Sequence, residues 1–262
     1  MAANLFREER LRLIMEIIYD KKKVFVKGLA GKFGRSVSSI RLDLSELESR
    51  GLINRTHGGA ILNESIGNHY IKNKSLIRLR DETNKAEKER IGKAVLDLIH
   101  DGDSIMIDGG STTYYVAKYL KEKHGLTIIT TSYHLFPILL EIQDAKIFLT
   151  GGLVYREYED LIGDIPIDTI RRFNPDCVII GIDGVSLDHG LTIAVPPVAA
   201  IKRNMVEVGK KIIAVADSSK FGNVSLLHIA DLSNIHTIVS DTGVPEKFIQ
   251  AIEGSGVELI LA

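Results

Sequence analysis

The chain has few of the features that mark secreted, disulfide-stapled or membrane-spanning proteins. It has a single cysteine in 262 residues, so no disulfide can form within it. That residue, Cys177, lies in an apolar run and is expected to be a small core residue. No apolar run approaches the roughly 18 residues that a membrane-spanning helix needs, and the first residues show no secretory signal pattern. We therefore expect a cytoplasmic protein without a membrane partner.

The sequence is also poor in motifs for metal, cofactor or covalent chemistry. Its eight histidines show no paired short spacing and a second cysteine is missing, so a metal site is not expected. No G-x-S-x-G motif follows a strand pattern, and the dinucleotide motif G-x-G-x-x-G is absent. We expect no cofactor and no Ser-His-Asp catalysis. One enzymatic alternative stays open, because an isomerase can move protons beside a carbonyl with aspartate and lysine alone.

What the chain does have is ample core-forming residues and an uneven charge distribution. Hydrophobic residues make up 45% and charged residues 26%, which is typical of globular domains. Residues 1–60 contain 12 Lys and Arg against 7 Asp and Glu, a net charge of +5. The remainder contains 21 basic and 27 acidic residues, a net charge of −6. A small basic head on an acidic body suggests that the head binds a polyanion.

The first 62 residues are predicted to form a winged helix-turn-helix. Apolar residues recur at helical spacing in three segments, 5–19, 26–33 and 37–50. Gly34 is placed to end the second helix, and Ser36 is placed to cap the third. Residues 52–62 are predicted to form two short strands around a His-Gly-Gly turn.

This pattern favours a DNA-binding function for the head. A helix fits the major groove, where residues near its N-terminus reach base edges, and a basic hairpin can lie along the phosphates. The residues expected to contact DNA are Arg35, Ser36, Ser38, Ser39, Arg41, Arg55 and His57. The alternative is a three-helix module that binds protein through a solvated basic face. The basic residues of the hairpin favour DNA over that alternative.

The rest of the chain has a different organisation. Residues 63–84 are polar and weakly periodic and are expected to form a linker that merges into a helix. Over residues 85–262, apolar strand patterns alternate with amphipathic helical patterns. This alternation predicts an α/β domain with a largely parallel sheet that is covered on both faces. Because such sheets bind ligands beyond the carboxyl ends of their strands, functional residues should follow the strands.

Small and polar residues do follow five predicted strands, in the stretches IDGGSTT, TTSYH, LTGG, GIDG and VADSSKFG. Backbone N–H groups freed by glycines, together with a helix N-terminus after Thr112, would make an anion site. Hydroxyl groups, lysine charges, and carboxylates that accept from sugar hydroxyls would complete it. The effector-binding candidates are Asp108, Gly110, Ser111, Thr112, Thr113, Thr131, Gly151, Gly152, Asp183, Lys202 and Lys220. For Gly151 and Gly152, a tight turn without ligand contact explains the glycine equally well.

These residues resemble the DeoR family of bacterial transcriptional regulators over nearly the whole chain. The family has segments similar to F-G-V-S-x-x-T-I-R-R-D-L, L-E-x-x-G and R-x-H-G-G-A, and this chain has FGRSVSSIRLDLSELESRGLINRTHGGA. In the body, DGGSTT and DSSKFG match the family's D-x-G-S-T-T and D-S-S-K-F-G stretches. Arg80, Asn84 and Lys88 match the family segment that leads into that domain. The chain departs from the family pattern at Arg35, Ser39, Leu42, Ser132 and Pro197–Val198.

The resemblance implies a DNA-binding repressor of a sugar-utilisation operon that a phosphorylated sugar releases from its operator. It implies a winged helix-turn-helix over residues 1–62, a linker over 63–84, and an effector domain over 85–262 whose fold resembles ribose-5-phosphate isomerase. The expected partners are double-stranded operator DNA, a phosphorylated sugar, and further copies of the chain in a dimer or tetramer. A phosphosugar isomerase-like enzyme with an accessory head is the alternative.

Two departures from the family pattern qualify what the resemblance implies. Leu42 stands where the family has a second arginine, which suggests weaker phosphate contact or a changed operator preference. Pro197–Val198 stands where the family has one or two glutamates. A missing carboxylate there suggests an altered ligand and argues against a retained isomerase activity.

Overall fold

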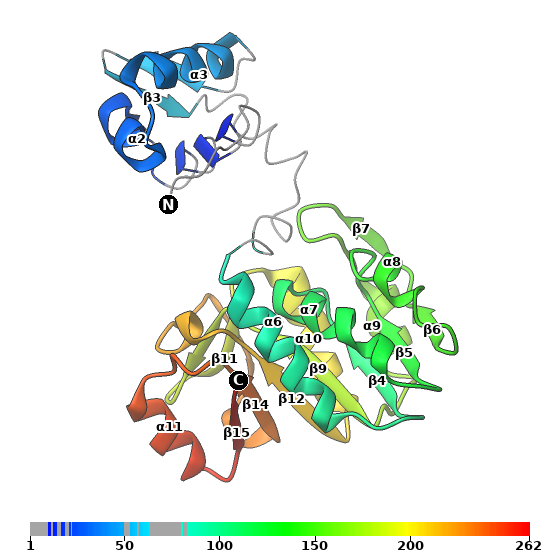
Figure 1. The fold of residues 1–262 in the computed structure, drawn as a ribbon. Coiled ribbons are helices and arrows are strands. Elements are labelled where there is room, and N and C mark those ends of the chain that lie inside the picture. Colours follow the sequence, from blue (N-terminus) through cyan, green and yellow to red (C-terminus); the bar gives the residue numbers. More distant parts are fainter. Residues whose placement is uncertain are drawn as a thin grey trace. The chain divides into compact units, whose positions relative to one another are not determined.

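The computed structural model divides the chain into two compact units, Met1–Lys74 and Ser75–Ala262. Figure 1 draws elements of the first unit in blue and the second unit from cyan to red. The described residues are 10, 11, 13, 14, 17, 18, 21, 23–49, 53–56, 58–62, 80 and 83–262. The finer boundaries at residues 62 and 84 stay predictions.

In the first unit, helices α2 (Val26–Phe33) and α3 (Val37–Ser49) form where helical spacing predicted them. Gly34 adopts a left-handed conformation with a φ of 59° and ends α2. The Ser36 hydroxyl accepts a hydrogen bond from the Ser39 N–H at 3.1 Å, so Ser36 caps α3 as expected. The apolar faces of both helices share one core with three earlier residues, Leu11, Ile14 and Ile18.

The sheet of the first unit contains one strand more than the sequence predicted. Strands β2 (Ile53–Thr56) and β3 (Gly59–Leu62) form the expected hairpin, and β1 (Lys23–Phe25) pairs with the other edge of β3. A side chain at Gly59 would place its Cβ 1.8 Å from the Val24 carbonyl oxygen. Glycine at this position therefore lets β1 approach. A strand of three residues is too short for its alternation to be recognised in the sequence.

The second unit is built on a seven-stranded sheet in which all neighbouring strands are parallel. Its order is β15 (Glu258–Leu261), β14 (Thr237–Ser240), β12 (Lys211–Val215), β9 (Cys177–Gly181), β4 (Ser104–Ile107), β5 (Thr127–Thr130) and β6 (Lys146–Leu149). The chain adds β5 and β6 on one side of β4, then adds β9 and the later strands on the other. The direction of winding therefore reverses between β4 and β9. Sheets of this type hold ligands in the crevice at such a point.

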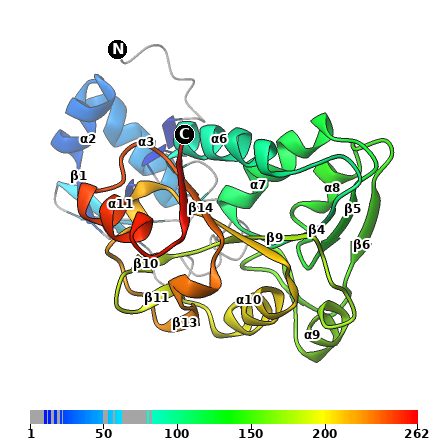
Figure 2. The ribbon, with the colours of Figure 1, turned by 90° about the horizontal axis from the view of Figure 1, so that it is seen from below.

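Helices cover both faces of this sheet, as the alternating pattern predicted (Figure 2). One face carries α6 (Lys85–Ala94), α7 (Ser111–Tyr119) and α8 (Phe136–Leu139), and the other carries α9 (Asp164–Ile170), α10 (Pro196–Val208) and α11 (Glu246–Glu253). Neighbouring strand residues enter opposite cores: Ile105 and Ile107 pack on the α7 side, and Met106 on the α10 side. Cys177 is buried in the α7-side core as expected, and burial raises the pKa of its thiol to about 12.

Two small antiparallel sheets accompany the parallel sheet and were not predicted. The first has the order β10 (Gly184–Ser186), β11 (Gly190–Ile193) and β13 (Leu227–Ala230). The second pairs β7 (Leu153–Tyr155) with β8 (Asp160–Ile162). Each of these strands has three or four residues, and most of them lack the nearly continuous apolar run that marks the strands of the parallel sheet.

Candidate functional sites

A cavity lies at the carboxyl ends of β4 and β9, where the winding of the sheet reverses. Six of the predicted effector-binding residues line it, namely Gly110, Ser111, Thr112, Asp183, Lys202 and Lys220. They come from the turns after β4 and β9, from α7 and α10, and from a short 3-10 turn (η3, Ser218–Lys220). The fold thus brings together residues that are up to 110 positions apart in the sequence. Their role in binding stays a prediction.

The turn after β4 presents the N-terminus of α7 to this cavity. The Thr113 hydroxyl accepts a hydrogen bond from the Gly110 N–H at 2.6 Å and lies 2.9 Å from the carbonyl oxygens of Asp108 and Gly110. Thr113 is therefore buried and holds the turn. The N–H groups of Ser111 and Thr112 open the helix and have no acceptor inside it. Together with the helix dipole, such groups favour an anion.

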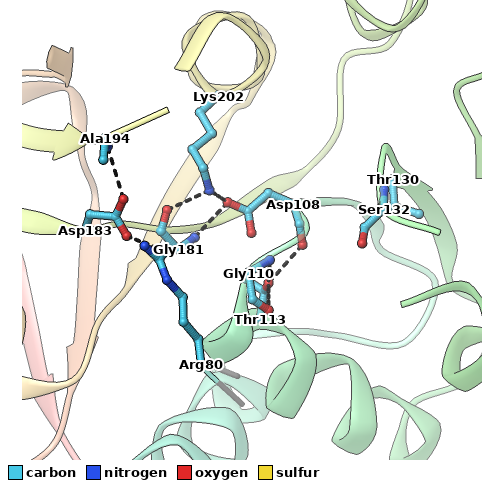
Figure 3. A network of polar contacts seen from close by, with 10 residues as sticks. All are labelled: Arg80, Asp108, Gly110, Thr113, Thr130, Ser132, Gly181, Asp183, Ala194 and Lys202. Carbon is cyan, nitrogen blue, oxygen red and sulfur yellow. Dashed lines mark hydrogen bonds and ion pairs between the residues drawn. The ribbon is translucent and has the colours of Figure 1, made fainter. Parts of the chain in front are cut away.

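A buried ion pair lies beside the cavity (Figure 3). The Lys202 ammonium pairs with the Asp108 carboxylate and donates to the Gly181 carbonyl oxygen at 2.8 Å. The Gly181 N–H donates to Asp108 at 2.9 Å, so this carboxylate ties β4 to β9. Burial lowers the pKa of Lys202, and the nearby Arg80 charge lowers it further. The other carboxylate oxygen of Asp108 is buried and has no hydrogen-bond partner among the described residues.

Lys220 differs from Lys202, because its ammonium makes no hydrogen bond or ion pair with the part of the chain that the structure describes. The carboxylate near it, Asp217, accepts hydrogen bonds from the Asn84 side chain at 2.9 Å and the Ser219 N–H at 3.1 Å. Burial raises the pKa of Asp217, but the Ser219 hydrogen bond, the Lys220 charge and Asn84 outweigh burial and lower it overall. Asp217 is thus ionised and accepts hydrogen bonds from the protein. The Lys220 ammonium can still donate hydrogen bonds to another partner.

Three lining residues at the start of the second unit were not among the predicted site residues. They are Arg80, Thr83 and Lys88. The Arg80 guanidinium pairs with Asp183 at 2.8 Å and lies 5.5 Å from the centre of the Tyr158 ring. The Lys88 ammonium donates to the Arg80 carbonyl oxygen at 2.6 Å. Only the resemblance of this segment to the DeoR family pointed to Arg80 and Lys88.

Other predicted effector residues lie outside the lining of the cavity. Asp108 and Thr113 are buried next to it, and Thr131 is buried after β5. Gly151 and Gly152 follow β6 with φ angles of 76° and 129°, and a Cβ at Gly152 would meet Pro166 at 2.8 Å. The backbone turn therefore accounts for both glycines. An effector contact by Thr131, Gly151 or Gly152 stays a prediction.

Val198, which departs from the family pattern, lines the cavity from the first turn of α10. It is 2% exposed and apolar. Ser132, a second departure, is fully buried, and a Cβ at Gly109 would lie 2.8 Å from its hydroxyl oxygen. One departure thus changes the chemistry of the cavity wall, and the other fills space behind the turn.

In the first unit, α3 and the two residues before it carry five of the seven residues that were predicted to contact DNA. Those that are exposed are Arg35, Ser36, Ser38 and Arg41, and Ser39 is half-buried. In the hairpin, the Arg55 guanidinium donates to the Ser45 hydroxyl at 2.9 Å, and the Arg55 backbone N–H donates to the Glu48 carboxylate at 3.1 Å. These contacts brace β2 against α3 and leave Arg55 exposed. His57 lies outside the described residues.

A second buried ion pair holds the buried face of α3 in place. The Arg10 guanidinium donates to both carboxylate oxygens of Asp43, at 2.6 and 3.0 Å. The side chains are 9% and 1% exposed, and the Asp43 hydrogen bond raises the pKa of Arg10. Asp43 lies on the face of α3 opposite to the exposed residues Ser38 and Arg41, so the pair helps to orient that exposed face.

No group of three or more His, Cys, Asp or Glu side chains among the described residues is placed to hold a metal ion. No described helix is long and apolar enough to cross a membrane. The charged groups of the cavity are lysines, an arginine and carboxylates.

Comparison with known proteins places these features in one family. The model of the DeoR C-terminal sensor domain matches residues 83–242, and that of the DeoR-like helix-turn-helix domain matches residues 10–66. A putative aga operon transcriptional repressor of Escherichia coli O157:H7 is 30% identical over 97% of this chain and 93% of its own length. The HTH-type transcriptional repressor GlcR of Bacillus subtilis is 31% identical over 98% of this chain and 97% of its own length. A ribose 5-phosphate isomerase from Plasmodium falciparum aligns with a TM-score of 0.37 at 17% identity over 51% of each chain.

Both family models describe parts of a regulator, and the two relatives align along nearly their whole length with this chain. The alternative of a phosphosugar isomerase is therefore not favoured. A helix-turn-helix head and a sensor domain follow one another in the order that the sequence predicted. The chain belongs to the DeoR family of DNA-binding transcriptional regulators.

Proposed function

We propose that the protein represses a sugar-utilisation operon and that a phosphorylated sugar releases it from the operator. The charge of the cavity carries this proposal. Four cations line it, namely Arg80, Lys88, Lys202 and Lys220, against the carboxylates of Asp183 and Asp217. With Asp108 beside the cavity the cations still exceed the carboxylates by one, so an anionic ligand is favoured over a neutral or cationic one.

The phosphate of the ligand is assigned to the N-terminus of α7 and to Lys220. The Ser111 and Thr112 N–H groups supply donors, and the Lys220 ammonium supplies a charge whose donors make no hydrogen bond or ion pair with the described residues. The sugar hydroxyls are assigned to Asp183 and to the free carboxylate oxygen of Asp108. A carboxylate accepts hydrogen bonds in several directions, which suits a polyhydroxylated ligand.

The sign of regulation is proposed from the relatives. The Escherichia coli and Bacillus subtilis proteins are both named transcriptional repressors, and the first is named for an operon. DNA contact is assigned to Arg35, Ser36, Ser38, Ser39, Arg41, Arg55 and His57. A dimer or tetramer is proposed because operator half-sites usually match a two-fold axis of the protein. The cytoplasm, where the DNA lies, is the proposed location.

Fluorescence anisotropy of the full chain on its own upstream DNA, titrated with a panel of sugar phosphates, tests the proposal. We expect salt-sensitive binding that one panel compound relieves, because phosphate contacts make log affinity fall with log salt. Lys220→Ala should still bind the DNA but need at least about tenfold more of that compound, since it loses a charge-assisted hydrogen bond. Lys247→Ala, on the exposed side of α11, is the matched control.

Three results would count against the proposal. Absence of DNA binding at low salt would remove the assigned role of the head. DNA binding that no sugar phosphate changes would remove the assigned effector class. A Lys220→Ala variant that responds at the wild-type concentration would remove Lys220 from the phosphate site.

A further inference from the structure

Arg80 differs from the other cations that line the cavity, Lys88, Lys202 and Lys220, in its place along the chain. It lines the cavity, and it falls within the predicted linker, residues 63–84. Its side chain is 42% exposed, which distinguishes it from Lys88 and Lys202, both 3% exposed. Figure 3 shows its guanidinium reaching from the α6 side of the cavity to the Asp183 carboxylate.

In the Arg80–Asp183 pair, Arg80 binds the carboxylate to which the sugar hydroxyls of the ligand are assigned. One Asp183 oxygen accepts from Arg80 at 2.8 Å, and the other accepts from the Ala194 N–H at 3.1 Å. Both oxygens of this carboxylate therefore have protein donors. Each carboxylate oxygen can still accept a second hydrogen bond, but the paired guanidinium neutralises the charge of Asp183, so a ligand hydroxyl meets a stronger acceptor once Arg80 leaves.

Of the paired cations that line the cavity, Arg80 is the one that can change partner at least cost. Lys202 is held by Asp108 and by the Gly181 carbonyl oxygen, and both contacts are buried. Lys88 is buried and donates to the Arg80 carbonyl oxygen. The Arg80 fork carries five N–H donors, and a single hydrogen bond joins its side chain to Asp183.

We infer that Arg80 exchanges partners when the cavity fills. Without ligand its guanidinium neutralises Asp183. With a phosphate bound at the α7 N-terminus and Lys220, the guanidinium turns to the phosphate and frees Asp183 to accept from a ligand hydroxyl. The inference rests on the proposed function and adds to it a ligand contact made by the predicted linker.

The physical basis is a competition between two acceptors for one guanidinium. A phosphate carries more charge than a carboxylate and accepts two parallel hydrogen bonds from arginine. Asp183 keeps the Ala194 N–H after the exchange and gains a hydroxyl, so neither oxygen is left unpaired. The Arg80 charge also lowers the pKa of Lys202, which lines the cavity, so the guanidinium already lies close enough to influence a charge inside the cavity.

A double-mutant cycle on the full chain tests the exchange, with inorganic phosphate as the probe and calorimetry as the measurement. Arg80→Gln should weaken phosphate binding at least about tenfold, the loss expected for a charge-assisted hydrogen bond. Asp183→Asn should tighten it about threefold or more, because the competing carboxylate is gone. In the double variant, Asp183→Asn should no longer raise phosphate affinity, because the guanidinium that this substitution would release is absent.

Arg80→Lys is the second variant and should bind phosphate with intermediate affinity, because it keeps the charge and loses the fork. The matched control is the surface pair Lys118–Glu89, which joins α7 to α6 at 3.4 Å outside the cavity lining. Lys118→Gln and Glu89→Gln should leave phosphate affinity unchanged. A change of similar size in these variants would mean that general electrostatics explain the cycle, and the exchange would be rejected.

An additive cycle would overturn the inference, since Asp183 would then act only as a nearby negative charge. Unchanged phosphate affinity in Arg80→Gln would overturn it too, and so would the absence of phosphate binding to the wild-type chain. The first two outcomes leave the proposed function untouched, whereas the last would also count against its phosphate site. A sugar-phosphate panel that fails to release DNA would reject the effector class and leave the phosphate cycle to decide the role of Arg80.

Discussion

Asp43, Asp108 and Asp160 are each 1% exposed, but their surroundings differ. Asp43 and Asp108 face the cations Arg10 and Lys202. Asp160 has no cationic partner in the described part of the chain and accepts from the Leu161 N–H at 3.0 Å. Burial raises the pKa of Asp160 to about 6, and the nearby Thr131 hydroxyl and the Leu161 N–H offset only part of that rise. The first two carboxylates should stabilise the fold when charged, and the third when protonated.

Asp160 should make the stability of the second unit depend on pH, and the sign of that dependence follows from its pKa. Its pKa of about 6 in the folded chain exceeds the ordinary value of 3.8. The folded chain therefore holds a proton that the unfolded chain releases, and the free energy of unfolding falls as pH rises from about 4 to about 6, by about 3 kcal/mol. Asp160→Asn should remove this fall and stabilise the unit at pH 7. Urea unfolding of the full chain at pH 4, 5, 6 and 7 measures both effects.

The matched control for Asp160 is Asp168→Asn, which changes an exposed carboxylate on α9. It should shift stability by less than about 0.5 kcal/mol at either end of that range. If the free energy of unfolding of Asp160→Asn fell with pH between 4 and 6 as steeply as that of the wild type, another group would have to bind the proton.

Asp43 should be essential to the stability of the first unit. Asp43→Ala leaves the Arg10 guanidinium buried without its carboxylate, and breaking a buried pair in this way typically costs roughly 3–5 kcal/mol. The Arg10→Met/Asp43→Leu double variant removes both charges and should recover most of that loss. Urea unfolding of the two variants checks the order. A double variant that is less stable than Asp43→Ala would show that the pair itself, and not the burial of a lone charge, decides the cost.

At the scale of the element, α3 carries an apolar residue on its outer face. Leu42 is 65% exposed beside Arg41 and stands where the DeoR family has arginine. Leu42→Arg should add about one phosphate contact, which steepens the slope of log affinity against log salt by about 0.9. Anisotropy on the upstream DNA at several salt concentrations measures the slope.

The control for the α3 prediction adds the same charge to the second unit. Leu226 is 76% exposed there, and Leu226→Arg should leave the salt slope unchanged. Equal slopes for the two variants would mean that net charge, and not the position on α3, governs DNA affinity.

Elements with a long period or a strong cap were predictable from the sequence, and short or non-local ones were not. The helices α2 and α3 repeat an apolar pattern at helical spacing, and the strands of the parallel sheet are nearly continuous apolar runs that alternate with helices. Strand β1 and the strands of the two small sheets in the second unit have three or four residues and mostly lack such a run.

The candidate site was predictable to a similar extent. Glycine-rich strand ends marked the α7 turn and its neighbours, because their residue types are unusual. The Arg80–Asp183 contact joins residues 103 positions apart, and its arginine lies in a polar segment without a clear pattern. Thr113 was expected to face a ligand, and its hydroxyl holds the turn instead. The spacing of residues along the sequence does not tell whether the Thr113 hydroxyl faces a ligand or the turn.

At the scale of the whole molecule, the two functions are thermodynamically linked. If the effector lowers DNA affinity by some factor, DNA must lower effector affinity by the same factor. We expect a coupling of about 1–3 kcal/mol, or roughly 5–150-fold. Calorimetric titration of the releasing sugar phosphate, with and without saturating operator DNA, should give the factor that anisotropy gives in the opposite direction. Unequal factors would mean that a third equilibrium, such as assembly, takes part.

The order of the units along the chain also has a consequence during synthesis. The first unit ends at Lys74, whereas the cavity needs residues as late as Lys220. Domains generally fold as units from the N-terminus, at a synthesis rate of about 5–20 residues per second. The 146 residues between these positions take roughly 7–30 s to emerge at that rate. A newly made head can therefore fold and meet DNA while its ribosome is still translating. During that interval the cavity is incomplete, so under the proposed function the nascent protein cannot yet respond to a sugar phosphate.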